Sequence, residues 1–300
     1  MENFKISDIN LLTKTVLIGL PGVGKSALSN ELCRIVKQET GFVLENVSSD
    51  LRLREVRKDV NNPVVRKFMQ EHNIPPEDFP LLIQTNNFMH KYGEQTFRDL
   101  ESDVIVDMLE RGEFEGKIPN LGGKAMLHEK TARAFKQKGY KIIYLKMTVK
   151  EIAKHIVQDF EATNDGATIT RSNINGPISD ALRQSDPEYA DVSPSKFVLN
   201  RISKMQKTIK ADSLSTAIKK AMLSRQRKLY RYEQRLKLRD DIAFEVMSRF
   251  DTERGTLYQK VADQTLNRTS DIHQDALAIL SLIRQSQTSY LLNKVSHTLE

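Results

Sequence analysis

The residues best suited to chemistry lie near the amino terminus, in the segment Gly19-Leu-Pro-Gly-Val-Gly-Lys-Ser26. Its spacing, G-x-x-x-x-G-K-[ST], is typical of a phosphate-binding loop, in which backbone N–H groups and a helix N-terminus surround nucleotide phosphates. Glycine lets the main chain approach phosphate oxygens, lysine places a positive charge on the β and γ phosphates, and serine offers a hydroxyl to Mg²⁺. We therefore predict that the protein binds ATP together with Mg²⁺.

Each position of this segment has an expected role. Lys25 is the candidate catalytic residue, because its ammonium group can neutralise charge on the transferred phosphate, and Ser26 is the candidate metal ligand. A glycine turn that merely precedes a helix is the alternative interpretation. Nucleotide contacts are expected from Gly19, Gly22, Val23, Gly24, Lys25, Ser26 and Ala27.

The segments around the loop alternate between strand and helix patterns. Aliphatic and β-branched residues predict a buried strand over 14–19, and apolar residues at helical spacing predict a helix over 27–37. This alternation predicts an α/β fold, a P-loop three-layer sandwich with a mostly parallel sheet flanked by helices, plus an additional helical insertion and C-terminal region. Further strands are expected over 41–47, 117–121, 141–147 and 242–247, and further helices over 97–109 and 257–292.

Composition suggests a division into domains. Residues 163–195 are rich in Asn, Asp, Gly, Ser and Pro, which is typical of a long loop or insertion. We expect a kinase-like core over 1–160, an insertion over 161–225 that is first loop-rich and then basic and helical, a return to the core over 226–250, and a C-terminal helical extension over 251–300.

Positive charge is concentrated in one segment. The whole chain carries a formal charge of +7, but Lys196–Arg239 holds fourteen Lys and Arg residues against Asp212 and Glu233, a charge of +12. Such a segment can attract phosphorylated ligands, nucleic acid or an acidic membrane surface, or it can be the solvated face of long helices.

Other kinds of site are disfavoured. Cys33 is the only cysteine, so an intramolecular disulfide and a cysteine-built zinc site are excluded, and the six histidines lack metal-ligand spacing. A guanine-reading Asn-Lys-x-Asp run is absent. No apolar run is long enough to span a membrane and no secretory signal precedes the loop, so we expect a cytoplasmic protein, with its oligomeric state left open.

Four further segments, in order along the chain, resemble signatures of the shikimate kinase family, which belongs to the nucleoside-monophosphate-kinase-like P-loop kinases. Residues 47–53 (VSSDLRL) resemble an Asp-x-Asp segment, and residues 92–101 (YGEQTFRDLE) resemble a Gly-Glu-x-x-Phe-Arg-x-x-Glu signature. Residues 121–124 (LGGK), followed by the expected strand, resemble a triple glycine, and residues 225–230 (RQRKLY) resemble an Arg-x-Pro-Leu-Tyr segment.

The resemblance implies roles for individual residues. Asp50 would hydrogen-bond the acceptor hydroxyl as its base or positioner, and Arg98 would bind the acceptor carboxylate in bidentate geometry. Gly122 and Gly123 would bring backbone N–H groups close to the substrate and the γ-phosphate. Without the resemblance, an ion pair between Arg98 and Glu101, an N-cap at Asp50 and a turn at the glycines are the ordinary interpretations.

Arginines in the second half of the chain complete the implied site. A second carboxylate ligand is expected at Arg225 or Arg227. An arginine that stabilises the transferred charge is expected in the loop-rich insertion, at Arg171 or Arg183.

Three residues depart from the family pattern. Ser48 replaces the first Asp of Asp-x-Asp and Arg54 replaces a Glu, so that magnesium would depend more heavily on Ser26. Lys124 replaces the third glycine, and its side chain is expected to protrude toward the phosphate site.

These observations favour one function and leave two alternatives open. The leading prediction is an ATP-dependent kinase, a phosphotransferase that acts on a hydroxyl of a small, carboxylated acceptor, with shikimate the first to test. The basic segment suggests a polynucleotide or tRNA-end kinase that binds nucleic acid. The three departures suggest a non-catalytic nucleotide-binding interaction module.

Overall fold

A computed structural model of the chain describes residues 6–163, 214–269 and 271–296, although it leaves the side chains of 6–7, 86, 159–163, 214–236 and 286–296 undescribed. The chain forms two compact units. One consists of residues 1–147 and 253–300, and the other of residues 148–252.

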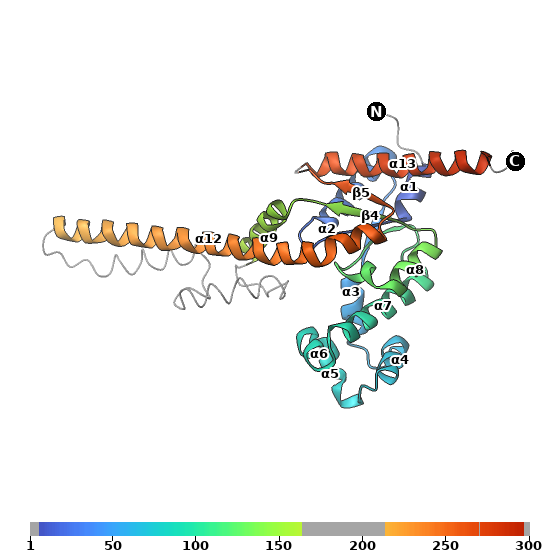
Figure 1. The fold of residues 1–300 in the computed structure, drawn as a ribbon, viewed down its shortest axis with the longest axis horizontal. Helices are drawn as coiled ribbons and strands as arrows, with labels where there is room; N and C mark the ends of the chain where they lie inside the picture. Colours follow the sequence, from blue (N-terminus) through green and yellow to red (C-terminus); the bar gives the residue numbers. More distant parts are fainter. Residues whose placement is uncertain (1–5, 164–213, 270, 297–300) are drawn as a thin grey trace. The chain divides into compact units, whose positions relative to one another are not determined.

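The first unit is built on a five-stranded sheet with strand order β2-β3-β1-β4-β5, in which all neighbouring strands are parallel (Figure 1). All four residues of β1 are buried, as expected for a central strand covered on both faces. The predicted parallel α/β sheet is thereby confirmed. The strands are β1 (Thr15–Ile18), β2 (Glu45–Ser48), β3 (Lys117–Asn120), β4 (Lys141–Lys146) and β5 (Gln264–Asn267).

The strand register brings the ends of three strands together. Asn120, the last residue of β3, pairs with Leu17 of β1 and with Ser48 of β2. Because the carboxyl ends of parallel strands lie at one edge of a sheet, the segments that follow β1, β2 and β3 all begin at that edge. These segments contain the phosphate-binding loop, Asp50 and the paired glycines.

Helices of the first unit flank this sheet (Figure 1). Helix α13 packs against α1 and α2, whereas α7 packs against α3, α4, α6 and α8. The helices are α1 (Ile6–Thr13), α2 (Lys25–Thr40), α3 (Ser49–Val56), α4 (Pro63–Glu71), α5 (Phe79–Ile83), α6 (Thr85–Tyr92), α7 (Glu94–Glu110), α8 (Glu129–Gln137) and α13 (Ile272–Ser296), with short 3-10 turns η1 (Pro76–Asp78) and η2 (Ala125–Leu127).

The predicted helix over 27–37 is α2, and its ends have local causes. Leu28, Leu32 and Val36 are fully buried, so one face of the helix packs on the core. The helix ends at Gly41, whose φ of 73° is in the left-handed region and whose N–H donates to Lys37 O at 3.0 Å. The helix predicted over 97–109 is α7, which begins three residues earlier.

The second unit contains α9 (Val149–Thr163) and most of α12 (Leu214–Val261), whose last residues belong to the first unit. The strand predicted over 242–247 is wrong, because these residues lie within α12. The buried residues Ala243, Val246, Met247 and Phe250 recur at intervals of three and four, which is helical spacing. A short apolar run does not by itself separate a strand from a buried helix.

The helix predicted over 257–292 is interrupted by a strand. α12 ends at Val261, β5 pairs with β4, and α13 begins at Ile272. Only Leu266 of β5 is buried, so the four-residue strand shows too little alternation to be recognised in the sequence. The segment 251–300, expected to be helical, thus adds a strand to the sheet.

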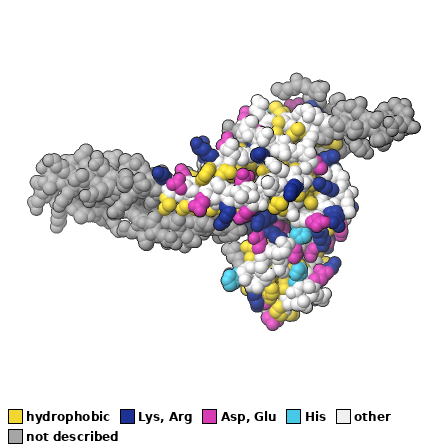
Figure 2. Space-filling view, viewed as in Figure 1, with side chains coloured by type: hydrophobic (Ala, Val, Ile, Leu, Met, Phe, Trp, Pro, Cys, Tyr) yellow, Lys and Arg dark blue, Asp and Glu magenta, His cyan; other side chains and the backbone are white. Residues whose placement is uncertain are grey.

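The visible face of the described side chains carries basic and acidic groups interspersed with one another (Figure 2). No helix in the described ranges has both the length and the apolar character to cross a membrane. Of the loop predicted over 163–195, Thr163 is the last residue of α9 and residues 164–195 lie outside the described residues. Residues 196–213 and the side chains of 214–236, which make up most of the basic segment, also lie outside the described residues.

Candidate active site

The phosphate-binding loop connects β1 to α2. Gly22 and Gly24 have φ values of 83° and 84°, a conformation that L side chains rarely adopt. At Gly19 a Cβ would lie 2.7 Å from the backbone oxygen of Leu145, so glycine is required there as well. Gly24 is the N-cap of α2 and supplies no side-chain hydrogen bond to the first turn, as suits a helix N-terminus that receives an anion.

Lys25 and Ser26 occupy the first turn of α2. The Lys25 ammonium donates to the carbonyl oxygens of Gly19 and Leu20 at 3.0 and 3.3 Å, so its charge lies over the loop. The Ser26 hydroxyl accepts a hydrogen bond of 2.9 Å from the Asn120 side chain, which links the loop to the end of β3. Both residues therefore lie in the loop, and their roles toward nucleotide and metal stay predictions.

The side chains of this loop fit Mg²⁺ bound together with a nucleotide better than a metal ion held by protein ligands alone. In the described part of the chain, no group of three or more His, Cys, Asp or Glu side chains could hold a metal ion. Mg²⁺ characteristically binds through one or two protein groups together with phosphate oxygens and water. Ser26, whose side chain is exposed beside the loop, is the hydroxyl that would hold it.

Two carboxylates meet at Gly122. A Cβ at this position would lie 2.7 Å from Oδ1 of Asp50 and 3.0 Å from Oε1 of Glu101. The Gly122 N–H donates to Ser49 Oγ at 3.1 Å, so in this structure it is directed at α3 and not at an open substrate position. Asp50 therefore lies in the first turn of α3 beside the paired glycines, and its role toward an acceptor hydroxyl stays a prediction.

Gly123 connects this cluster to the phosphate-binding loop. A Cβ at Gly123 would lie 3.6 Å from Pro21 Cγ, which is ordinary van der Waals contact. The carbonyl of Gly123 accepts a hydrogen bond from the Tyr258 hydroxyl. The Tyr258 ring stacks on Tyr144 of β4 with centroids 5.4 Å apart, and burial raises the pKa of Tyr258 to about 12.

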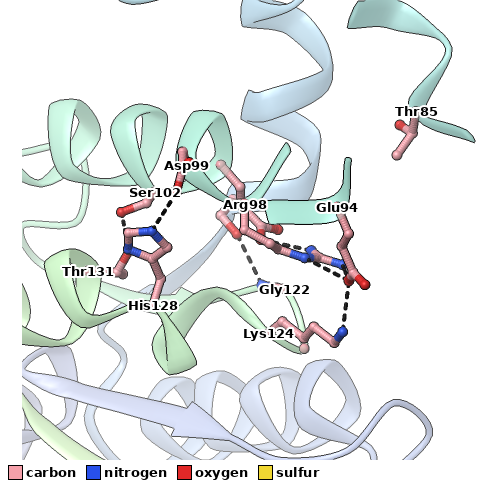
Figure 3. Close-up of polar contacts among 12 residues, drawn as sticks. Thr85, Glu94, Arg98, Asp99, Ser102, Gly122, Lys124, His128 and Thr131 are labelled. Carbon is pink, nitrogen blue, oxygen red and sulfur yellow. Dashed lines mark hydrogen bonds and ion pairs between the residues drawn. The ribbon is translucent and has the colours of Figure 1, made fainter. Parts of the chain in front are cut away.

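Arg98 is held between two carboxylates of its own helix, α7 (Figure 3). Its Nη1 donates to Glu101 at 2.9 Å, and its Nη2 and Nε donate to Glu94 at 3.0 and 3.3 Å. The ordinary ion pair with Glu101 is therefore present. Because a guanidinium group has five N–H donors, these three hydrogen bonds leave two donors for a ligand.

Lys124 was predicted to protrude toward the phosphate site, but it pairs with Glu94 instead. Its ammonium lies 2.7 Å from the Glu94 carboxylate (Figure 3). Lys124 and Arg98 together lower the pKa of Glu94. The residue that replaces the third glycine thus connects the glycine segment to the first turn of α7.

Glu101 is 4% exposed, and burial raises its pKa against the opposing effects of Arg98 and Arg57. Arg57 is itself buried, and it donates to Thr85 Oγ1 at 2.6 Å and to Leu53 O at 3.3 Å. The sequence pattern did not reveal Arg57 as a cation beside Glu101. Its signal was the interval of seven residues from Asp50, which places Arg57, the C-cap of α3, on the same side of the helix as Asp50.

Arg254 is a second residue that sequence analysis missed. It is buried, burial lowers its pKa, and it hydrogen-bonds Tyr258 and lies close enough to Arg98 for their charges to repel. Residues 254–258 (RGTLY) have the spacing Arg-x-x-Leu-Tyr, which is the spacing of the family's Arg-x-Pro-Leu-Tyr segment. Neither Arg225 nor Arg227 stands at this interval from Leu229 and Tyr230.

The remaining candidate arginines lie outside the described residues. This applies to the side chains of Arg225 and Arg227 and to Arg171 and Arg183 entirely. Of the other departures from the family pattern, Ser48 ends β2 beside Asn120, and Arg54 adds its charge to the effect of burial in lowering the pKa of Arg57.

Comparison with known proteins relates this chain to one family. The model of the shikimate kinase family matches residues 82–210. The shikimate kinases of Rhodococcus erythropolis and Rhodococcus jostii are each 28% identical to the chain over 138 residues, which is 46% of this chain and 61% of theirs. The chain thus spans less than two thirds of the length of these relatives.

Two solved shikimate kinases have weak overall similarity to the structure. The enzyme from Bacteroides thetaiotaomicron gives a TM-score of 0.42 at 13% identity, covering 90% of this chain and 97% of that one. The enzyme from Acinetobacter baumannii, solved in complex with shikimate, gives 0.43 at 14% identity, covering 91% and 93%.

Proposed function

We propose that this divergent relative of the shikimate kinase family is an ATP-dependent kinase, which transfers the γ-phosphate to a hydroxyl group of a small, carboxylated acceptor. The observation that carries the proposal is the meeting of Asp50 and Glu101 at Gly122, one residue from the contact with Pro21 of the phosphate-binding loop. An acid that can position a hydroxyl therefore lies beside the loop that would hold the donor phosphates.

On the nucleotide side, Lys25 and the N-terminus of α2 supply positive charge and N–H donors to the phosphates. Ser26 would hold Mg²⁺, which when bound neutralises phosphate charge. The contact between Ser26 and Asn120 keeps this hydroxyl at the end of β3.

On the acceptor side, Asp50 would accept a hydrogen bond from the reacting hydroxyl, as its base or as its positioner. Arg98 would bind the carboxylate through its two remaining N–H donors, and Arg254, which is buried close to it, would be the second cation. Shikimate, which carries hydroxyl groups and a carboxylate, is the first acceptor to test.

Steady-state ADP release tests the proposal. Shikimate should stimulate ADP release from Mg·ATP, and Lys25→Ala and Asp50→Asn should lower kcat by about 10²-fold or more. Arg254→Met should raise KM for the acceptor, and an equal rise with Arg225→Met or Arg227→Met would assign the second carboxylate ligand to that residue instead. ADP release that is indifferent to shikimate would remove shikimate as the acceptor.

The two alternatives remain predictions with their own tests. Tight ATP binding without transfer to any of a broad panel of acceptors would favour the non-catalytic module. Oligonucleotide binding whose affinity falls steeply with salt would favour the polynucleotide kinase, and a flat salt dependence would exclude it. The role of Arg171 or Arg183 in stabilising transferred charge likewise remains a prediction.

A further inference from the structure

Arg268 follows β5 and contacts the phosphate-binding loop directly. Its Nη1 donates a hydrogen bond to the carbonyl oxygen of Val23. The same nitrogen occupies the space where a Cβ on Gly24 would stand. An arginine that is 245 residues away in sequence therefore packs against the backbone of the glycine-rich loop.

The Arg268 side chain is fixed at its other end by Asp275 of α13. Its Nε lies 2.9 Å from Asp275 Oδ2, and the two side chains are only 4% and 2% exposed. Asp275 also accepts hydrogen bonds from the backbone and hydroxyl of Thr269, at 2.8 and 3.0 Å. The Arg268 N–H donates to Lys146 O at 2.7 Å, which continues the pairing of β5 with β4. Both the backbone and the guanidinium group are thus held.

The geometry of the peptide bond gives this contact a consequence. A trans peptide is planar, and its C=O and N–H point in opposite directions. Because the Val23 carbonyl is directed at Arg268, the N–H of Gly24 is directed away from Arg268. We propose that Arg268 is a positioning residue for nucleotide binding, which orients the Gly24 N–H toward the β-phosphate by holding the Val23–Gly24 peptide in one orientation.

The sequence of the loop makes such a support useful. Glycine populates both signs of φ with little penalty, so peptides that flank glycines rotate more freely than others. The loop conformation places Gly24 at a φ of 84°, but a glycine has no side chain whose contacts could maintain that angle. A buried guanidinium bound to the adjacent carbonyl supplies the missing restraint. The inference rests on the proposed nucleotide binding, but it does not require phosphoryl transfer.

Calorimetric binding of ADP and AMP to the full chain tests the role of Arg268. Arg268→Met should weaken ADP binding by about ten- to a hundredfold, the expected effect of losing a charge-assisted hydrogen bond, while AMP affinity changes less than threefold. Arg268→Lys, which keeps a donor near Val23, should recover part of the ADP affinity. A merely structural role would not separate the two nucleotides.

A matched control removes another arginine–carboxylate pair of α13. Arg284 donates to Asp8 at 2.8 Å, a contact with α1 and not with the phosphate-binding loop. Arg284→Met should lower the thermal midpoint as Arg268→Met does, without changing the ratio of ADP to AMP affinity. If Arg268→Met does not fold, the ratio of ADP to AMP affinity is measured in Arg268→Lys and Asp275→Asn instead.

The outcomes separate this inference from the proposed function. Equal losses of ADP and AMP affinity, or no loss, in a folded Arg268→Met protein would overturn the role of Arg268 alone. Absence of ADP binding by the wild-type protein would overturn nucleotide binding and this inference together. Absence of kinase activity with intact, selective ADP binding would overturn the kinase proposal and leave the role of Arg268 standing.

Discussion

Asp50 and Glu101 face each other across Gly122, with carboxylate oxygens 2.7 and 3.0 Å from the position that a Cβ on this glycine would occupy. Two acids this close repel each other when both are ionised, and Glu101 is in addition buried. Arg98 and Arg57 are the cations that oppose this repulsion. The candidate acceptor site therefore depends on a balance of charges drawn from α3 and α7.

Gly122→Ala should impair catalysis more than folding. The new methyl group would overlap the Asp50 carboxylate, which is at the end of a side chain and can move aside at a cost of about 1–2 kcal/mol. Moving it displaces the group proposed to position the hydroxyl, so kcat/KM for the acceptor should fall by about tenfold or more. Gly123→Ala should lower kcat/KM less than Gly122→Ala does, because its Cβ would meet only Pro21 at contact distance and would leave the Asp50 carboxylate in place.

Arg57→Met should make the free energy of unfolding more sensitive to pH. Glu101 has a pKa raised above its unfolded value, so the native state loses stability as pH rises from about 4.3 through the folded pKa. Removing Arg57 raises the Glu101 pKa further and extends this loss to higher pH. Urea unfolding should show a deficit of about 2–4 kcal/mol at pH 8 and a smaller one at pH 5.

The pH dependence of this deficit has a direct control. In a Glu101→Gln background, Arg57→Met should cost nearly the same at pH 5 and pH 8, because residue 101 no longer titrates. A deficit that is independent of pH in the presence of Glu101 would show that Arg57 acts through packing on Phe97, which its guanidinium approaches to 5.4 Å.

Glu31→Gln should remove stability at neutral pH but not in strong acid. Arg34 binds the Glu31 carboxylate at 2.5 and 2.7 Å, and His273 of α13 lies 2.8 Å from it, which lowers the pKa of Glu31 to about 2. The stabilisation is present above the unfolded pKa of about 4.3 and is lost as pH falls toward 2. We expect a difference of about 1 kcal/mol at pH 6, since the pair is partly exposed, and none near pH 2. Denaturant unfolding of both proteins across this range measures it.

Tyr258→Phe should weaken the acceptor site by releasing the Gly123 carbonyl. This substitution leaves the Gly123 carbonyl without its donor, at an expected cost of about 1 kcal/mol, removes the hydrogen bond with Arg254, and keeps the stacking on Tyr144. Thermal unfolding and acceptor KM are the measurements, and KM should rise. Tyr140→Phe, at a buried tyrosine that packs on Phe135, should leave KM unchanged. Equal KM effects of the two substitutions would contradict the role of Tyr258.

The sequence by itself determined the features that depend on residues close together in the chain. The phosphate-binding loop could be predicted because its glycines, Lys25 and Ser26 act within eight consecutive positions. The helices α2 and α7 followed from apolar residues at helical spacing, and the strand β4 followed from a continuous apolar run. The same reasoning failed at 242–247, where a short apolar run does not separate a strand from a buried helix, and at β5, where one buried residue defines no periodicity.

Among the described residues, tertiary structure decided which charged side chains gather at the candidate site. Arg57 and Arg254 each stand in segments that read as ordinary helix surface, and they gain significance only because burial brings their charges to Glu101 and Arg98. Lys124 was expected at the phosphates, but Glu94, thirty residues earlier in the chain, holds it instead. Arg268 reaches Val23 because β1, β4 and β5 are parallel neighbours in the sheet, so the segments that follow β1 and β5 begin at the same ends of the strands. The spacing of residues in the sequence predicts contacts between residues a few helical turns apart. Contacts between distant segments depend on the strand order and on burial, which only the tertiary structure shows.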